Sequence, residues 1–210
     1  MDKHLELKWD KAVTVVRAGG VLAYPTETLY ALGCNARDES AVHRVAMVKG
    51  RPSGKPMPLI VGAMEQLPLA ACTVKAEERE LMQRFWPGPL TLLLQAAEGL
   101  SSLVRDRDGQ VAVRWTAHPL AARLCVEAGC PIVATSCNLA GCPAASRPEE
   151  VDSSLLLKTE GLLADRPWPA GGLPSTVAEV TGPGQIRIFR LGAVSVEELS
   201  WAGYRMESAE

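Results

Sequence analysis

The chain has 210 residues, of which 47% are hydrophobic and 22% charged, a composition typical of one globular domain of ordinary size. Its 22 basic and 24 acidic side chains give a formal net charge of −2, so it lacks the overall basic surplus of chains that bind nucleic acid by neutralising phosphates. No apolar run reaches the roughly 18 residues that span a bilayer, and the charged N-terminus has no signal-peptide core. We expect a cytoplasmic protein with no membrane contact, consisting of a single domain over residues 1–210, with a core over about 9–199 and a short tail over 200–210.

The first half of the chain predicts three helices and two strands. Apolar residues at helical spacing predict a helix over residues 7–18, which Gly19-Gly20 ends. VLAYPT (21–26) is typical of a buried strand, and Ser40 is the expected N-cap of a second helix that ends at Lys49-Gly50. LIV (59–61) predicts a further strand, and Thr73 is the expected cap of a third helix that runs through Phe85.

The second half predicts further strands, a long helix, and shorter helices that begin at Pro148 and at the capping box Ser195–Glu198. The expected strands are LTLLL (90–94), VAVRW (111–115), PIVATS (131–136), STVAEV (175–180) and QIRIFR (185–190), and the long helix covers 118–129. Helices and strands interleave without strict alternation and without a boundary between domains. The sequence therefore predicts an α/β fold with one mixed sheet flanked by helices.

Six cysteines occur without any CxxC pair: Cys34, Cys72, Cys125, Cys130, Cys137 and Cys142. In a chain of this length without a signal peptide, we expect them to be reduced thiols, and we predict no metal site. GRPSGKP has only three residues between its glycines, and Pro56 stands where a P-loop has Ser or Thr. A Ser/His/Asp triad through His118 is disfavoured, because nothing marks a nucleophile elbow.

Polar residues follow several predicted strands, where loops converge in open α/β sheets and ligands bind. They are Thr26, Glu27, Thr28, Lys49, Arg51, Lys55, Arg114, Thr135, Ser136, Asn138, Ser175, Thr176 and Arg190. Lys49, Arg51 and Lys55 place three cations within seven residues, a cluster suited to a polyanion such as a triphosphate. Lys49 is also compatible with a position at the negative end of its helix, and Arg51 and Lys55 with solvated loop positions. Arg114, inside a buried strand, requires a partner or a ligand.

Seven segments between Val21 and Gly192 resemble the YrdC-like threonylcarbamoyl-AMP synthase family in order and spacing. They are YPTETLYALGC, VKGRPSGKPMPLIV, FWPGPLTLLL, VAVRWTAHPLA, VATSCNLAG, PSTVAEV and IRIFRLG. The resemblance implies a twisted mixed sheet with helices on both sides and a large basic cavity. It also implies an ATP-dependent nucleotidyltransferase that makes L-threonylcarbamoyl-adenylate from L-threonine, bicarbonate and ATP and releases pyrophosphate. That adenylate would serve the threonylcarbamoyladenosine modification of tRNA, whose second step belongs to a separate transferase complex.

The resemblance also implies a role for each matching residue. Lys49 and Arg51 are the expected catalytic residues at the ATP phosphates, and the nucleotide would further contact Ser136, Asn138 and Arg190. L-threonine would be surrounded by Thr26, Arg114, Thr135 and Ser175, with Arg114 binding its carboxylate. Mg²⁺ would arrive with the nucleotide.

Three positions depart from the family pattern: Ala31 stands where YGLG is common, Cys137 where TSAN is common, and Ala140 where Ser is frequent. Ala31 matters most, because a methyl group there alters the substrate floor or occupies a position that needs a positive φ. Two rival functions stay open. One is an RNA-binding module of the same fold, with tRNA as its ligand, and the other is carbamoyl transfer to a different amine, as in longer maturation proteins.

Overall fold

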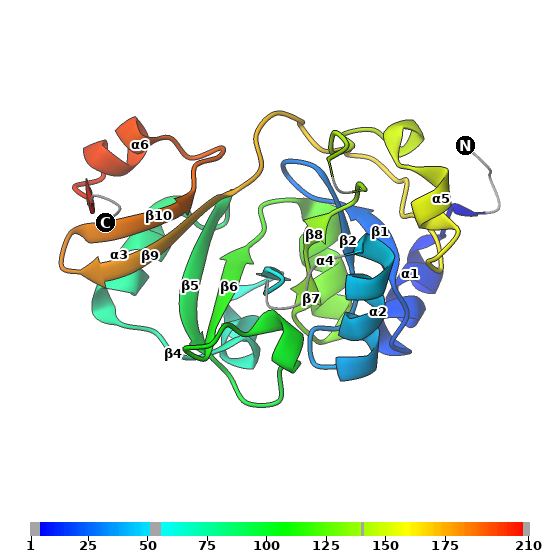
Figure 1. Ribbon diagram of the computed structural model, residues 1–210, viewed down its shortest axis with the longest axis horizontal. Coiled ribbons are helices and arrows are strands. Elements are labelled where there is room, and N and C mark those ends of the chain that lie inside the picture. Colours follow the sequence, from blue (N-terminus) through cyan, green and yellow to red (C-terminus); the bar gives the residue numbers. More distant parts are fainter. Residues whose placement is uncertain (1–4, 51–55, 140, 208–210) are drawn as a thin grey trace.

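The computed structural model describes residues 5–50, 56–139 and 141–207 of the chain (Figure 1). In these ranges the α-helices are α1 (Trp9–Arg17), α2 (Glu39–Lys49), α3 (Ala76–Phe85), α4 (Pro119–Ala128), α5 (Ser153–Leu156) and α6 (Val196–Trp201). The strands are β1 (Leu22–Pro25), β2 (Tyr30–Gly33), β3 (Leu59–Val61), β4 (Ala71–Thr73), β5 (Leu90–Ala96), β6 (Gln110–Trp115), β7 (Ile132–Val133), β8 (Thr135–Ser136), β9 (Thr176–Gly182), β10 (Gln185–Arg190) and β11 (Arg205–Met206). Pro148 begins a short 3-10 helix, η4 (Pro148–Glu150).

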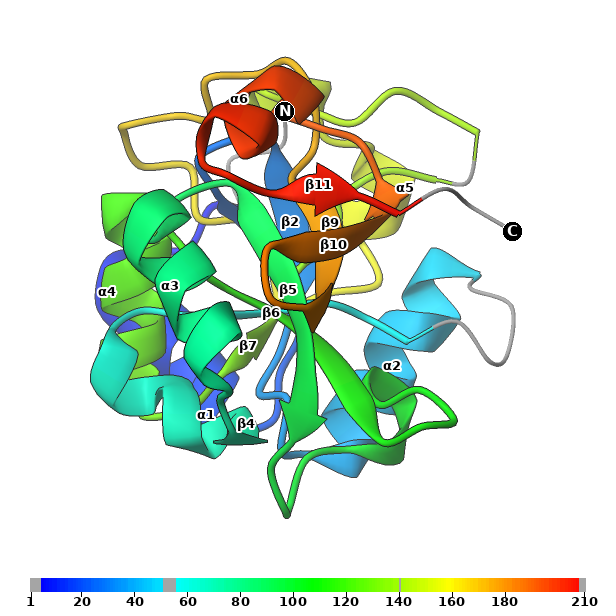
Figure 2. The ribbon, with the colours of Figure 1, turned by 90° about the vertical axis from the view of Figure 1, so that its left-hand side faces the viewer.

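The strands form two hydrogen-bonded sheets. The small sheet has the order β1-β2-β8, and the large one has the order β11-β10-β9-β5-β6-β3-β7, with β4 also paired to β5. The large sheet is mixed, since β3–β6 and β5–β9 are parallel while β5–β6 and β9–β10 are antiparallel. Helices lie on both sides of the strands (Figures 1 and 2). The predicted mixed α/β fold is confirmed. The expectation of one sheet is wrong, because the strands are divided between two sheets that meet near the middle of the molecule.

The stretch from 131 to 136, predicted as one strand, is divided between the two sheets. β7 pairs with β3 in the large sheet, whereas β8 pairs with β2 in the small one. Between them, the Ala134 amide donates 2.8 Å to the Pro58 carbonyl, and the Val133 amide donates 3.0 Å to the Cys34 carbonyl. The segment thus exchanges partners within five residues, which a hydrophobic pattern alone does not reveal.

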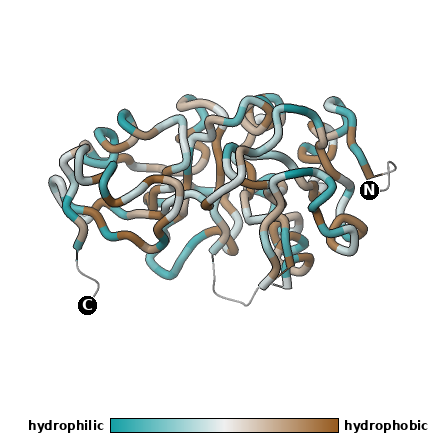
Figure 3. Tube along the Cα trace, turned by 90° about the horizontal axis from the view of Figure 1, so that it is seen from above, coloured by the Kyte–Doolittle hydropathy of each residue, from teal (hydrophilic) through white to brown (hydrophobic). Residues whose placement is uncertain are grey.

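Two hydrophobic clusters fill the space between helices and strands. The smaller one joins α1 and α4 to the strands through buried side chains such as Val13, Val16 and Leu124. The larger one lies under α2 and α3 and includes Val42 and Leu81. Hydrophobic segments run through the middle of the molecule, whereas many peripheral turns are hydrophilic (Figure 3). No helix in the described ranges is long and apolar enough to cross a membrane.

Two predicted helix caps are wrong. Asp38, not Ser40, caps α2, and its carboxylate accepts a hydrogen bond from a first-turn amide. The N-cap of α3 is Lys75, whose amide donates 2.7 Å to Glu78, while Thr73 belongs to β4. Asp38 and Ser40 are both capping residue types, and the path of the chain before α2 selects Asp38. At α3, Thr73 is taken up by the pairing of β4 with β5, so the helix begins after a lysine instead. The predicted capping box at the start of α6 is confirmed.

Strand β2 is a further difference, since no strand was predicted between VLAYPT and the second helix. It pairs antiparallel with β1, and all four of its residues are buried. Every described residue with a positive φ is a glycine. Ala31 therefore has ordinary strand geometry, and the concern that it occupies a position requiring positive φ is removed.

Candidate functional site

A cavity of about 600 Å³ lies where the two sheets meet. Its walls come from the loop after β1, from β2, β3, β5, β6 and β8, and from the segments before β9 and at the end of β10. The described residues that line it are Thr26, Thr28, Leu29, Tyr30, Ala31, Pro58, Leu59, Thr91, Arg114, Ala134, Thr135, Ser136, Asn138, Cys142, Pro143, Ala144, Gly172, Pro174, Ser175 and Arg190.

Most of the predicted site residues line this one cavity although they are far apart in sequence. They are Thr26, Arg114, Thr135, Ser136, Asn138, Ser175 and Arg190. Lys49, in the last turn of α2, contacts the end of β8 at the edge of this cavity through the carbonyl of Ser136. Arg51, with its neighbour Lys55, lies outside the described residues.

Lys49 is anchored to the loop that follows β8. Its ammonium donates 2.7 Å to the carbonyl of Ser136 and also donates to the carbonyl and the side-chain Oδ1 of Asn138. The Ser136 hydroxyl donates 2.6 Å to that same Oδ1. These three acceptors are neutral oxygens, and they orient the ammonium beside the cavity.

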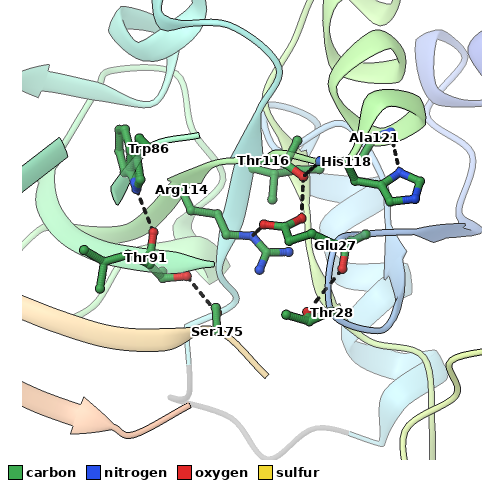
Figure 4. A network of polar contacts seen from close by, with 12 residues as sticks. Glu27, Thr28, Trp86, Thr91, Arg114, Thr116, His118, Ala121 and Ser175 are labelled. Atoms are coloured by element: carbon green, nitrogen blue, oxygen red, sulfur yellow. Dashed lines mark hydrogen bonds and ion pairs between the residues drawn. The ribbon is translucent and has the colours of Figure 1, made fainter. Parts of the chain in front are cut away.

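Arg114 enters the cavity from the end of β6 and is 7% exposed. Its Nε lies 3.5 Å from Oε1 of Glu27, and Oε2 of Glu27 accepts a 2.6 Å hydrogen bond from the Thr116 hydroxyl. Figure 4 shows Glu27 between Arg114 and Thr116, with the guanidinium extending toward Thr28 and Ser175. A planar guanidinium facing small hydroxyl side chains is suited to binding a carboxylate.

Ser175 connects Arg114's side of the cavity to Arg190 at the end of β10. Arg190 donates through Nε and Nη2 to the Ser175 carbonyl at 3.1 and 2.9 Å, and through Nη2 to the Ser175 hydroxyl at 3.1 Å. The buried Thr91 hydroxyl lies 2.9 Å from the same Ser175 hydroxyl (Figure 4). Thr91 was not predicted, because it stands inside the apolar strand LTLLL and nothing in that pattern marks it.

The loop after β1 is held in place by its own hydroxyls and by a distant segment. The Thr26 hydroxyl donates 2.7 Å to the Leu29 carbonyl, which closes the turn. The amides of Ala170 and Gly171 donate to the carbonyls of Glu27 and Thr28. The loop that carries Thr26 is therefore held at the cavity wall both by its own turn and by residues 170–171.

The charges of the site are predominantly positive. Its described lining includes Arg114 and Arg190, with Lys49 beside it, and no carboxylate. Glu27 stands behind Arg114 and does not line the cavity. Such a site attracts anions, and its hydroxyls supply both donors and acceptors for a polar ligand.

His118 has a structural position behind this site. Its Nδ1 accepts a hydrogen bond from the Ala121 amide as the N-cap of α4, and its Nε2 lies 3.0 Å from the Pro167 carbonyl. Since a carbonyl can only accept, the proton sits on Nε2. Burial lowers the pKa of His118 below its usual value, and the neutral ring caps the helix. Both ring nitrogens are thus occupied outside any Ser/His/Asp triad.

The chain matches a family model over residues 14–192, that of the Sua5/YciO/YrdC domain, which carries the description "Telomere recombination". A relative from Stenotrophomonas maltophilia, named threonylcarbamoyl-AMP synthase, is 43% identical over 161 residues, which cover 75% of this chain and 86% of the relative.

Two longer relatives come from Pyrococcus abyssi. A protein named threonylcarbamoyl-AMP synthase is 36% identical over 188 residues, or 90% of this chain and 55% of that protein. A solved structure, Sua5 complexed with L-threonine, is 34% identical with a TM-score of 0.86 and covers 96% of this chain and 60% of its own. The chain thus spans less than two thirds of these archaeal proteins. Together with the cavity between its two sheets, the match over most of its length shows that the chain belongs to the Sua5/YciO/YrdC family.

Proposed function

We propose that the protein synthesises L-threonylcarbamoyl-adenylate from L-threonine, bicarbonate and ATP and releases pyrophosphate. The observation that carries the proposal is that one cavity holds a buried guanidinium among small hydroxyls and, beside it, further cations. Those two environments suit the carboxylate of an amino acid and the phosphates of a nucleotide. The name threonylcarbamoyl-AMP synthase of the relatives and the L-threonine complex of Pyrococcus abyssi Sua5 support the same substrates.

We assign L-threonine to the side of the cavity around Arg114. The guanidinium binds the α-carboxylate, while the hydroxyls of Thr26, Thr135 and Ser175 surround the amino group and the side-chain hydroxyl. Since these groups are small, they leave room for the methyl group and for bicarbonate at the amine.

We assign ATP to the side around Lys49 and Arg190. Lys49 and Arg190 face the phosphates, Ser136 and Asn138 contact the nucleotide, and Arg51 supplies a further cation to the same phosphates. Arg51 enters this proposal through its place in the sequence motif. Because the described lining includes no carboxylate, a Mg²⁺ ion would be held by the phosphate oxygens and would neutralise part of their charge.

The reaction then depends on holding three reactants together. The threonine amine and bicarbonate form a carbamate with loss of water, and a carbamate oxygen attacks the α-phosphorus of ATP. The new oxygen–phosphorus bond displaces pyrophosphate, and Lys49, Arg51 and Arg190 stabilise its developing charge. Enclosure in the cavity protects the labile carbamate, and proximity supplies most of the rate enhancement.

The product is a reactive mixed anhydride, so we propose that a separate transferase complex in the cytoplasm consumes it in the threonylcarbamoyl modification of tRNA. Direct binding of tRNA is the rival activity. A true RNA-binding module would lose tRNA affinity steeply as salt concentration rises, whereas a synthase needs no such interaction.

The deciding experiment incubates the purified protein with ATP, labelled bicarbonate and one amino acid at a time, then measures pyrophosphate and acid-labile adenylate. L-threonine should support both products, and valine, which lacks the hydroxyl, should support much less, because polar atoms of the site are left unpaired. Equal turnover with valine would contradict the assignment of Thr26, Thr135 and Ser175.

A further inference from the structure

We infer that Glu27 is a positioning residue, which holds Arg114 by its Nε edge and so presents the terminal nitrogens of the guanidinium to the carboxylate of the substrate. The inference rests on the proposed function for the identity of that substrate. Glu27 itself does not line the cavity and would act only through Arg114.

The hydrogen-bond directions around Glu27 show how its carboxylate is fixed. The backbone amide of His118 can only donate, and it donates 3.2 Å to the Thr116 hydroxyl oxygen. The hydroxyl proton of Thr116 is therefore directed to Oε2 of Glu27, 2.6 Å away. An acceptor is required there, and a carboxylate oxygen meets that requirement.

The second carboxylate oxygen completes the arrangement. Oε1 of Glu27 is buried, has no hydrogen-bond partner within the part of the chain that the structure describes, and lies 3.5 Å from Nε of Arg114. Arg114 and Glu27 side chains are only 7% and 14% exposed, so solvent screens their attraction weakly. Among the described residues, Glu27 is the carboxylate within ion-pair distance of Arg114.

The geometry leaves the other edge of the guanidinium for a ligand. In Figure 4 the terminal nitrogens lie on the side facing Thr28 and Ser175, away from Thr116. A guanidinium held from its Nε side presents a planar pair of donors in a fixed direction, which is the geometry that two carboxylate oxygens require. The backbone of Glu27 is itself fixed by the Ala170 amide, so the pair rests on a rigid loop.

The negative charge of Glu27 and its hold on Arg114 have opposite effects on the affinity for a carboxylate. If its charge acted mainly through the field, Glu27→Gln would strengthen binding of a carboxylate, because a nearby negative charge has been removed. If it acts by orienting Arg114, the same variant weakens binding, because a buried guanidinium without its counter-ion turns toward other acceptors.

The experiment compares wild type with Glu27→Gln and Thr116→Val. The control is Glu127→Gln, which removes the exposed ion pair between Glu127 and Arg123 on α4. We expect Glu27→Gln to raise the KM and Kd for L-threonine about ten- to a hundredfold, with the KM for ATP within about twofold. Thr116→Val keeps the charge and loses only the hydrogen bond, so its effect should be smaller and in the same direction. The control should leave all three constants unchanged.

A spectroscopic readout tests the orientation without any substrate. In wild type the Nε–H proton of Arg114, identified by its loss in Arg114→Lys, should give a resolved, slowly exchanging NMR signal, and Glu27→Gln should shift and broaden it. Tighter threonine binding by Glu27→Gln, or an unchanged Arg114 signal in that variant, overturns the inference. If wild type releases no pyrophosphate with threonine, the proposed function fails, while the Arg114 signal still decides the role of Glu27.

Discussion

Lys49 and Arg114 bring positive charge to the cavity in different ways. The ammonium of Lys49 is oriented by neutral oxygens of the loop after β8, whereas the guanidinium of Arg114 is paired with a carboxylate. The first arrangement places a compact, localised positive charge beside the cavity, which suits a polyanion. The second keeps a directional donor at low net charge, which suits a zwitterionic ligand.

This difference predicts a crossed pattern of binding defects. Lys49→Ala should weaken the affinity for ATP about ten- to a hundredfold. Its affinity for threonine, measured by calorimetry without nucleotide, should stay within about twofold of that of wild type. Arg114→Ala should do the reverse. Lys49→Gln separates the two functions of the lysine, because it retains a donor for the loop and lacks the charge. Equal loss of both ligands in folded Lys49→Ala and Arg114→Ala would place both residues in one subsite.

The six thiols should divide into two classes. Cys72 and Cys142 are exposed, whereas burial raises the pKa of Cys130 to about 11 and of Cys137 to about 12, and raises that of Cys34 and Cys125 as well. At pH 8, Ellman's reagent should modify two thiols rapidly and the others only after unfolding, because the thiolate is the reactive form. In Cys72→Ser, the remaining fast reaction belongs to Cys142 at the cavity and should slow when ATP is added; six equally fast thiols would refute the buried positions.

At the level of single residues, the sequence motifs identified most of the polar cavity lining in advance. Ser136, Asn138 and Ser175 could be named because they stand in short, distinctive patterns at strand ends. Thr91 could not, because a hydroxyl inside an apolar strand usually packs in the core. Glu27 was visible as a polar residue after a strand, but its pairing with Arg114 joins segments far apart in the chain and depends on the fold.

Among the helices, α4 has a titratable N-cap. Because the pKa of His118 is lowered in the folded protein, the unfolded chain binds the imidazole proton more tightly than the folded chain does. The free energy of unfolding therefore rises with pH between the folded pKa of His118 and its usual value of about 6.5, and this contribution is lost as the pH falls below about 6.5. The groups that act on the ring include Glu27 and the Pro167 carbonyl, which oppose the shift, and Arg114, which adds to it.

Lowering pH from 7.5 to 5.5 should therefore reduce the melting temperature of wild type more than that of His118→Asn. The asparagine caps the helix through a side-chain oxygen and carries no titratable group, and a lost cap costs about 1 kcal/mol. Calorimetry at both pH values checks this, and identical pH dependence of the two proteins would contradict it.

Elements with a strong local signal were predictable, and those defined by their neighbours were not. Helices α1 and α4 have clear apolar periodicity and a glycine at the C-terminal end, and both form where expected. The short strands β2, β4 and β11 exist because a partner strand lies beside them, and their sequences do not distinguish a strand from a loop.

Across the whole molecule, the contact between the sheets depends on Gly33. A Cβ at this position would overlap the carbonyl oxygen of Val133, which is backbone and cannot turn aside. Gly33→Ala should therefore lower the free energy of unfolding by about 1–3 kcal/mol in urea denaturation. Gly182→Ala is the matched control in another strand, since its nearest neighbour is a side-chain oxygen at 3.6 Å. Equal stability of the two variants would show that the sheets separate without cost at this point.

The division of residues 132–136 between the two sheets also determines how the protein fluctuates. The Val133 amide is bonded toward one sheet and the Ala134 amide toward the other, so an opening event that exposes either amide to hydrogen exchange must disturb both. Among the described strands, β11 pairs with β10 alone and has no such double attachment. We therefore expect hydrogen exchange to reach β11 before it reaches the Val133 and Ala134 amides, so the two sheets stay joined at this point when the outer edge opens.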